Sequence, residues 1–130
     1  MIKGITASAA AELGEPSLSD LVLAITAANQ AEIARSLLEL LAESNRYAAV
    51  LDHSAEPVRR QSLARVTRID ITNISKVTGP LTRAGWLRVT ADAEGVIFRR
   101  SVVVDALLRG RSVEVWRRSA MARLSVPLAR

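Results

Sequence analysis

Four side chains that can hydrogen-bond to nucleic-acid bases lie close together near the middle of the chain: Thr72, Asn73, Ser75 and Lys76. An asparagine amide suits adenine and a lysine ammonium suits guanine, each good contact being worth roughly 1–3 kcal/mol. Taken singly, Thr72 and Ser75 also fit ordinary helix-start residues, and Asn73 fits a local cap. Taken as a set, the four favour contact with DNA.

The residues before this set predict a short amphipathic helix. Ser62 is a suitable N-cap, and the apolar positions that follow recur every three residues, as one face of a helix requires: Leu63, Val66 and Ile69. Asp70 then predicts a second N-cap, so the base-reading side chains would lie early in a second helix.

This second helix is predicted over Ile71–Thr78. Its apolar stripe is Ile74, Val77 and Leu81, and Gly85 is expected to stop it. Two short helices, of which the second presents small polar groups beside a lysine, describe a helix-turn-helix.

A β-hairpin is predicted directly after the second helix. Trp86–Thr90 would form one strand with Leu87 and Val89 on one face, Ala91–Gly95 the turn, and Val96–Arg100 the returning strand.

This arrangement resembles the DNA-reading unit of bacterial winged-helix transcription regulators of the MarR and ArsR kind. The matching landmarks are Leu63-Ala64, the run Thr72–Lys76, and Ala84–Leu87, and their spacing fits without a gap. The resemblance covers roughly residues 45 to 100. It implies that the second helix enters the major groove of double-stranded DNA and that hairpin 86–100 acts as the wing.

One pair of residues departs from the family pattern, which has good helix formers where this chain has Gly79-Pro80. Proline removes a backbone donor and disfavours helical angles in the residue before it. The pair predicts either a helix that ends near Thr78, with a new turn at Pro80, or a kinked helix.

Seven arginines on or beside these elements are expected to contact phosphates, and so to set register and affinity rather than sequence preference. They are Arg59, Arg60, Arg65, Arg68, Arg88, Arg99 and Arg100. The alternative is a solvated basic surface. We place Arg99 and Arg100 at the DNA because their strand follows the recognition helix.

The flanking segments predict further helices, and the fold class is mostly α (α+β). Residues 1–44 would form an N-terminal packing or dimerisation segment of one long helix or a helix pair. Asn29-Gln30 could interrupt its helical pattern, and Asn45 would end its last helix. Residues 45–100 would form the winged helix-turn-helix, and 101–130 a C-terminal helical extension. In the related regulators such terminal helices build the dimer, although an ordinary core helix of a monomer explains the N-terminal one nearly as well.

Several local boundaries follow from capping residues and prolines. Arg46–Ser54 is predicted as a helix with Tyr47, Val50 and Leu51 inward, and Val58–Gln61 as a short strand. Ser101 and Ser112 would cap two later helices, separated by Gly110, although Val102–Val104 could instead extend the strand before them and Val113–Trp116 alternate as a strand would. Pro127 would end regular structure.

Positive charge accumulates in the predicted DNA-binding part. Residues 1–45 contain two Lys/Arg against six Asp/Glu, whereas residues 46–130 contain 16 against seven, within a net charge of +5. Such asymmetry indicates a polyanionic partner, most simply nucleic acid.

Other chemistries have little support in the sequence. His53 beside Asp52 is the one histidine, and there is no cysteine, so we expect no catalytic group, no metal site and no cofactor. The longest apolar run, Leu21–Ile25, is too short for a membrane span, and no signal peptide is predicted. The expected protein is cytoplasmic. A small-molecule effector is possible in this type of regulator but is not indicated by any residue.

The sequence therefore favours a homodimeric regulator, most simply a transcriptional repressor, that binds double-stranded DNA in a sequence-specific manner. Two alternatives stay open. The same fold serves as a protein-interaction module, in which the acidic N-terminal helix would be the working surface, and as a DNA-binding domain in plasmid or phage replication and partition.

Overall fold

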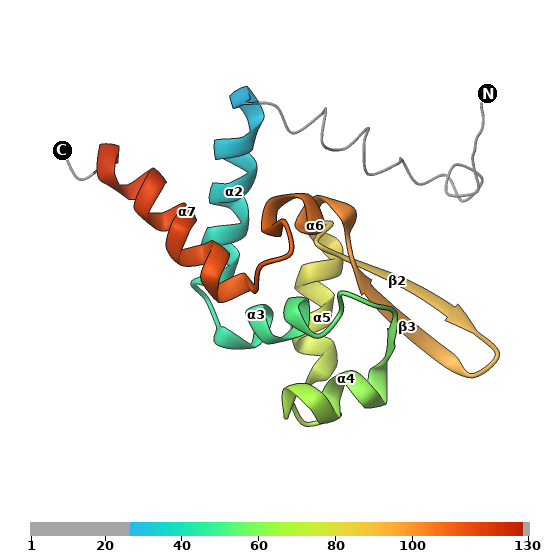
Figure 1. The fold of residues 1–130 in the computed structure, drawn as a ribbon. Coiled ribbons are helices and arrows are strands. Elements are labelled where there is room, and N and C mark those ends of the chain that lie inside the picture. The colour runs from blue at the N-terminus through green and yellow to red at the C-terminus, as the bar shows by residue number, and fades with distance from the viewer. Residues whose placement is uncertain (1–26, 129–130) are drawn as a thin grey trace, which may run out of the picture.

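The computed structural model describes residues 27–128, which form a mixed fold of helices and one small antiparallel sheet (Figure 1). The predicted α+β class is confirmed. The elements, in chain order, are α2 (Ala27–Leu41), α3 (Asn45–Asp52), β1 (Val58–Arg59), α4 (Arg60–Thr67), α5 (Ile74–Arg83), β2 (Leu87–Asp92), β3 (Gly95–Arg100), α6 (Val102–Leu108) and α7 (Val113–Leu128).

Helices α2 and α3 are separated by a short turn. Helix α2 passes through Asn29-Gln30 without a break and ends at Leu41. The Ser44 hydroxyl accepts a hydrogen bond from the Arg46 amide at 3.1 Å and so caps α3. Asn45 therefore begins α3, and the prediction that it ends the preceding helix was wrong. The residues predicted to face inward are buried: Tyr47, Val50 and Leu51. The predicted helix residues before Ala27 lie outside the described part of the chain.

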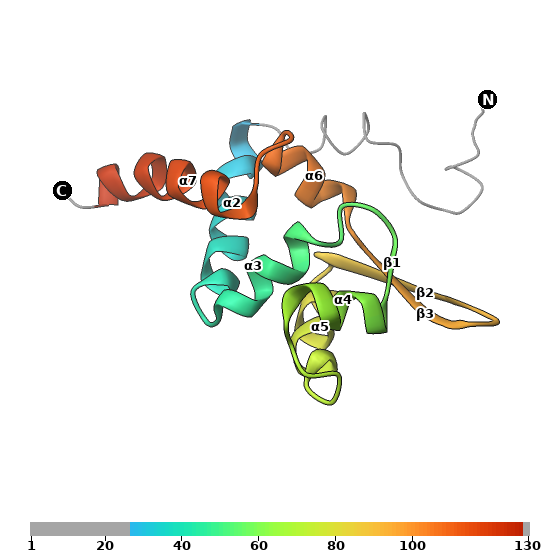
Figure 2. The ribbon, with the colours of Figure 1, turned by 60° about the horizontal axis from the view of Figure 1, so that its bottom comes forward.

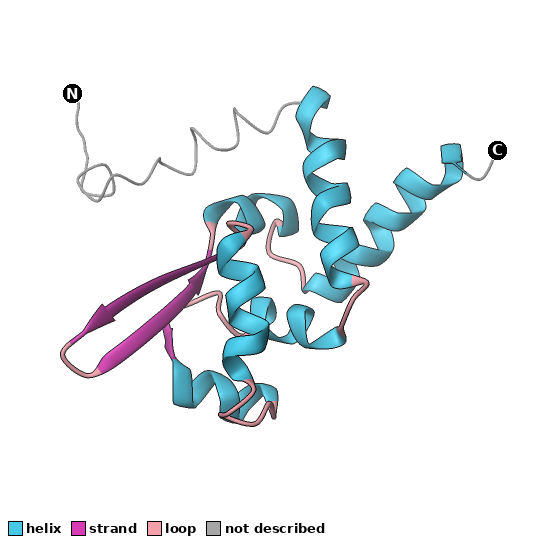
Figure 3. Ribbon diagram, turned by 180° about the vertical axis from the view of Figure 1, so that it is seen from behind, coloured by secondary structure: helices cyan, strands magenta, loops and turns pink. Residues whose placement is uncertain are grey.

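The sheet has the strand order β1-β3-β2, with both pairs antiparallel. Strand β1 is shorter than predicted because Arg60 and Gln61 already belong to α4. The predicted hairpin is confirmed, with a tighter turn than expected, since Asp92 pairs with Gly95. Leu87 is buried, but Val89 is 45% exposed because the hairpin projects beyond the helices (Figure 3).

Two helices follow the hairpin. Ser101 precedes α6, and Gly110, at φ 82°, separates α6 from α7. The Ser112 hydroxyl accepts a hydrogen bond from the Val115 amide at 3.1 Å, which confirms its capping role. Helix α7 includes Pro127, so the prediction that this proline ends regular structure was wrong.

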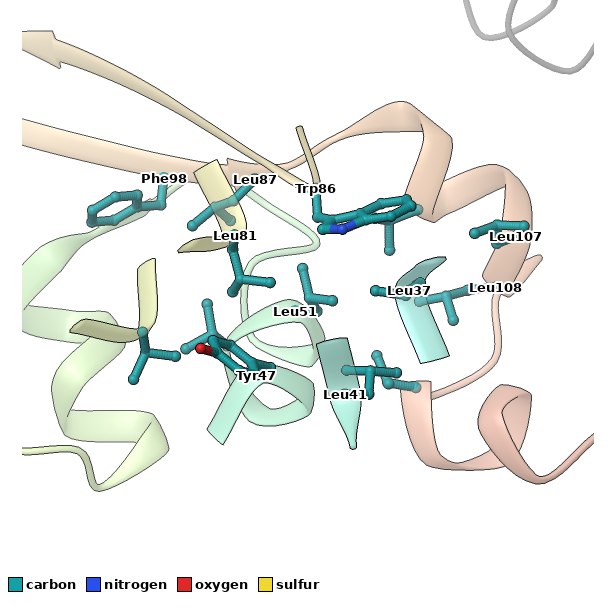
Figure 4. Packing of buried hydrophobic residues seen from close by; sticks show 14 of the residues in the cluster. Leu37, Leu41, Tyr47, Leu51, Leu81, Trp86, Leu87, Phe98, Leu107 and Leu108 are labelled. Atoms are coloured by element: carbon teal, nitrogen blue, oxygen red, sulfur yellow. The ribbon is translucent and has the colours of Figure 1, made fainter. Parts of the chain in front are cut away.

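One hydrophobic cluster joins the described helices to the base of the sheet (Figure 4). In this view Trp86 lies between Leu87 and Leu81 on one side and Leu37, Leu107 and Leu108 on the other. Leu and Val supply most of this core, with Trp116 of α7 also almost fully buried.

The arrangement of the helices leaves two separate sides of the molecule. Helices α2 and α7 lie together on one side, whereas α4, the lower end of α5 and the hairpin occupy the other (Figures 1 and 2). Among the described helices, none has the length and apolar character to span a membrane.

Candidate nucleic-acid interface

Helix α4 starts earlier than the sequence predicted. It begins at Arg60, after Arg59 in extended backbone, and no side chain caps it. Ser62 therefore lies in the first turn and is not the N-cap. The reason is that β1 pairs with β3 up to Arg59 and leads straight into the helix. Leu63 is buried as expected, but Val66 is 46% exposed.

Arg68 ends α4 in a left-handed conformation, with φ 61°. This turn lets the amides of Arg68 and Ile69 bond back to the carbonyls of Arg65 and Ala64, at 3.3 and 3.1 Å. These two bonds satisfy helix-end carbonyls. The turn buries Ile69 under the helix and leaves the Arg68 side chain exposed.

Asp70 organises the connection from α4 to α5. One of its carboxylate oxygens accepts hydrogen bonds from the Thr72 hydroxyl at 2.7 Å and the Thr72 amide at 2.8 Å. These bonds, led by the one from the hydroxyl, lower the pKa of Asp70. Asp70 thus caps a turn over residues 71–73 rather than the helix itself, and Thr72 lies at the exposed tip.

Helix α5 differs from the predicted Ile71–Thr78 at both ends, since it spans Ile74–Arg83. Thr72 and Asn73 precede the helix, and Asn73 occupies the N-cap position without a side-chain cap bond. The helix then continues through Pro80, so the expected early end at Thr78 was wrong. Gly79 permits this because it has no Cβ to meet the proline ring.

Gly85 ends α5, as the sequence predicts for a helix that continues past Pro80. Gly85 has φ 87°, and the amide of Trp86 bonds to the carbonyl of Leu81 at 2.9 Å. A residue other than glycine would be strained at this angle. The stop turns the chain sharply into β2 and so sets the hairpin beside α5.

The exposed face of α5 carries three polar side chains: Ser75, Lys76 and Arg83. Arg83 lies seven residues, or two turns, after Lys76 and therefore on the same face. Sequence reasoning missed Arg83 because it ended the helix at Thr78. The apolar spacing of Ile74, Val77 and Leu81 could have revealed this position, because a helix that is continuous over these residues places Arg83 on the face opposite them.

Four further predicted phosphate contacts also have exposed side chains around this face. Arg60, Arg65 and Arg68 lie on α4 or at its end, and Arg88 lies on β2. The predicted interface is thus assembled in part from three elements that the fold brings to the same side of the molecule (Figure 2).

Arg59 is engaged within the sheet. Its guanidinium reaches Asp92 through two bonds, of 3.0 and 2.7 Å, and Glu94 at 3.1 Å. The hydrogen bond to the Arg59 side chain, together with one from the Glu94 amide, lowers the pKa of Asp92 to about 2. Arg59 therefore neutralises the acidic tip of the hairpin instead of adding to the basic surface.

Arg99 and Arg100 converge on Asp105 of α6. Each donates to one carboxylate oxygen of Asp105 at 2.7 Å. Arg100 also donates to the Leu51 carbonyl at 3.3 Å, and its side chain is only 12% exposed. Our expectation that Arg100 faces DNA is corrected here, because the end of β3 turns its side chain into the junction with α3 and α6.

Metal-binding groups do not gather in the described residues. No group of three His, Cys, Asp or Glu side chains is placed to hold a metal ion there. The Asp52 carboxylate accepts a hydrogen bond from the Val113 amide at 2.8 Å and so caps α7, instead of pairing with His53. Comparison with protein-family models, curated proteins and solved structures found no match.

Proposed function

We propose that this protein binds double-stranded DNA in a sequence-specific manner as a winged helix-turn-helix. Helices α4 and α5 form the helix-turn-helix, α5 enters the major groove, and the β2–β3 hairpin is the wing beside the phosphate backbone. The observation that carries the proposal is the solvent-facing side of α5, where Ser75, Lys76 and Arg83 share one face next to exposed Thr72.

The charge around α5 supports the same proposal. Residues 60–91 contain six Arg/Lys against one acidic residue, Asp70, and the acidic residues that follow, Asp92 and Glu94, are bound by Arg59. The carboxylate of Asp70 already accepts two hydrogen bonds from Thr72. The positive field is thus little opposed on this side, and DNA binding through phosphates would gain from the release of counterions.

We further propose that the working form is a homodimer that acts as a transcriptional repressor. Helices α2 and α7 lie away from the N-terminal end of α5, so they are available to join two copies while that end of both recognition helices stays accessible (Figure 1). A dimer would place the two α5 helices in successive major grooves, about one helical turn apart.

The test is binding to random-sequence duplex DNA across a salt series, with the mass measured by light scattering. We expect a dimer whose log affinity falls linearly with log salt, by about 0.9 for each phosphate contacted. A duplex selected from the random pool should then lose roughly tenfold or more in affinity when Asn73 and Lys76 are both replaced by Ala. Arg118→Ala is the matched control, because Arg118 is exposed on α7, away from the proposed DNA-binding face, and light scattering checks that this variant keeps the same mass.

A second candidate function is a protein-interaction module. A surface groove of about 430 Å³ runs between α2 and the end of α5, and it is lined by Glu39, Glu43, Leu40 and Trp86 among others. An acidic rim over an apolar floor suits a basic peptide. Absence of DNA binding at low salt would favour this function over the first.

A further inference from the structure

Gly79 makes room for the side chain of Arg83 on the exposed face of α5. A Cβ built on Gly79 would lie 3.2 Å from Nη1 of Arg83 and 3.8 Å from its Cζ and Nη2. The guanidinium therefore lies directly over the glycine, one turn before the residue that carries it. Any side chain at position 79 would push the guanidinium outward or aside.

The direction of the Arg83 side chain brings its charge toward the start of α5. Helical side chains lean toward the N-terminus of their helix. Four residues correspond to about 6 Å along the axis, so the guanidinium is displaced by about that distance toward Lys76 and Ser75. The base-reading part of a recognition helix is its N-terminal part. Arg83 therefore reaches a region that its Cα position alone would not suggest.

The Gly79-Pro80 pair is unfavourable for the helix itself. Relative to Ala, glycine costs about 1 kcal/mol and proline about 3 kcal/mol in a helix interior. Both residues are only partly buried, so the core does not require them. The contact with the guanidinium gives Gly79 a second role, besides admitting Pro80 to the helix.

Arg83 also has the chemistry for reading a base. In the part of the chain that the structure describes, no carboxylate forms an ion pair with it. A guanidinium can donate two parallel hydrogen bonds to O6 and N7 of guanine, the commonest specific contact in the major groove. Lysine carries the same charge without this planar fork.

We propose that Arg83 is the specificity-determining side chain of the interface, and that it reads a guanine in the major groove from the position over Gly79. This inference rests on the proposed DNA binding and adds the class of base that the site selects. The competing explanation is that Arg83, in the last turn of α5, only stabilises the helix end through its charge. Lysine would preserve that effect, which makes Arg83→Lys the decisive substitution.

The experiment selects binding sites from a pool of randomised duplexes with the full-length protein. It compares the unmodified chain, Arg83→Lys, Gly79→Ala and the control Arg118→Lys, after circular dichroism confirms that each is folded. We expect the unmodified protein to enrich a site with an invariant guanine. Arg83→Lys should lose roughly ten- to a hundredfold of the preference for that guanine, while its affinity for random DNA and its salt slope stay nearly unchanged. Gly79→Ala should lose part of the same preference, and Arg118→Lys none.

The outcomes separate this inference from the proposed function. If Arg83→Lys and Gly79→Ala both enrich the same site with the same preference at every position, the guanidinium over Gly79 does not read a base, while DNA binding stands. Enrichment of no sequence by the unmodified protein would also overturn the inference. If the unmodified protein does not bind duplex DNA even at low salt, the proposed function fails and the inference falls with it.

Discussion

The Asp105 carboxylate binds two arginines, Arg99 and Arg100, that we expected from the sequence to contact phosphates. It binds Arg99 and Arg100 through separate oxygens, and Arg100 extends the link to the Leu51 carbonyl. The side chains of Arg100 and Asp105 are 12% and 20% exposed, so water screens this pair much less than a surface pair. The cluster ties the end of β3 to α3 and α6.

Replacing Asp105 by Ala should therefore destabilise the protein by about 2 kcal/mol, because Arg100 would be left partly buried without its partner. Urea unfolding measures the change. The matched control is Glu114→Ala, which removes the ion pairs to Arg117 and Arg118 on α7. Those pairs are largely exposed, so the control should lose less than about 1 kcal/mol. Equal losses in the two variants would show that the Asp105 cluster is no stronger than a surface pair.

At the scale of the element, α5 is held together by packing against its local preference. Gly79-Pro80 predicts a break, and Pro80 has no N–H to donate to the Lys76 carbonyl. Ile74 and Leu81 lie on either side of the pair, and both are fully buried. Two buried aliphatic side chains gain several kcal/mol from burial, which exceeds the roughly 3 kcal/mol that the proline costs.

Pro80→Ala should thus stabilise the protein by about 2 kcal/mol, since it restores a helical donor and leaves the buried stripe intact. The expected result is a higher midpoint of urea unfolding with an unchanged slope. Pro57→Ala is the control, because Pro57 precedes β1 outside any helix, where loss of proline should slightly destabilise the chain. A fall in stability for Pro80→Ala would mean that the ring contributes more through packing than it costs in the backbone.

At the scale of the whole molecule, one core connects the three predicted segments. Leu37 from the first, Leu63 from the second and Trp116 from the third belong to the same buried cluster. The Asp52 carboxylate also caps α7 by accepting a hydrogen bond from the Val113 amide. The terminal helices are therefore packed onto the proposed DNA-binding part rather than appended to it.

We expect the protein to unfold in one cooperative transition, as single domains of this size usually do. Trp86 and Trp116 provide separate fluorescence probes near the hairpin and in α7. Trp116→Phe and Trp86→Phe each leave a single tryptophan. For each variant, the unfolding curve measured by tryptophan fluorescence should coincide with the unfolding curve measured by far-ultraviolet circular dichroism. Two separated transitions would instead show that the C-terminal helix unfolds independently.

The order and type of the elements followed from the sequence because their causes are local. The buried spacing of Tyr47, Val50 and Leu51 predicted α3, and Gly85 predicted the turn into β2. Capping by Ser112 was likewise visible from neighbouring residues. The proposed contacts Thr72, Asn73, Ser75 and Lys76 also lie together because they are adjacent in the chain.

Tertiary structure decided which arginines are held in ion pairs and where the helices begin and end. Arg59 meets Asp92 across 33 residues, a pairing that exists only once β1 and β2 flank β3. Local preference alone ends α5 before Pro80, whereas burial of Leu81 continues it and brings Arg83 onto the exposed face. Ion pairs and helix length depend on neighbours distant in sequence, because a few kcal/mol of burial outweigh the local preference of one or two residues.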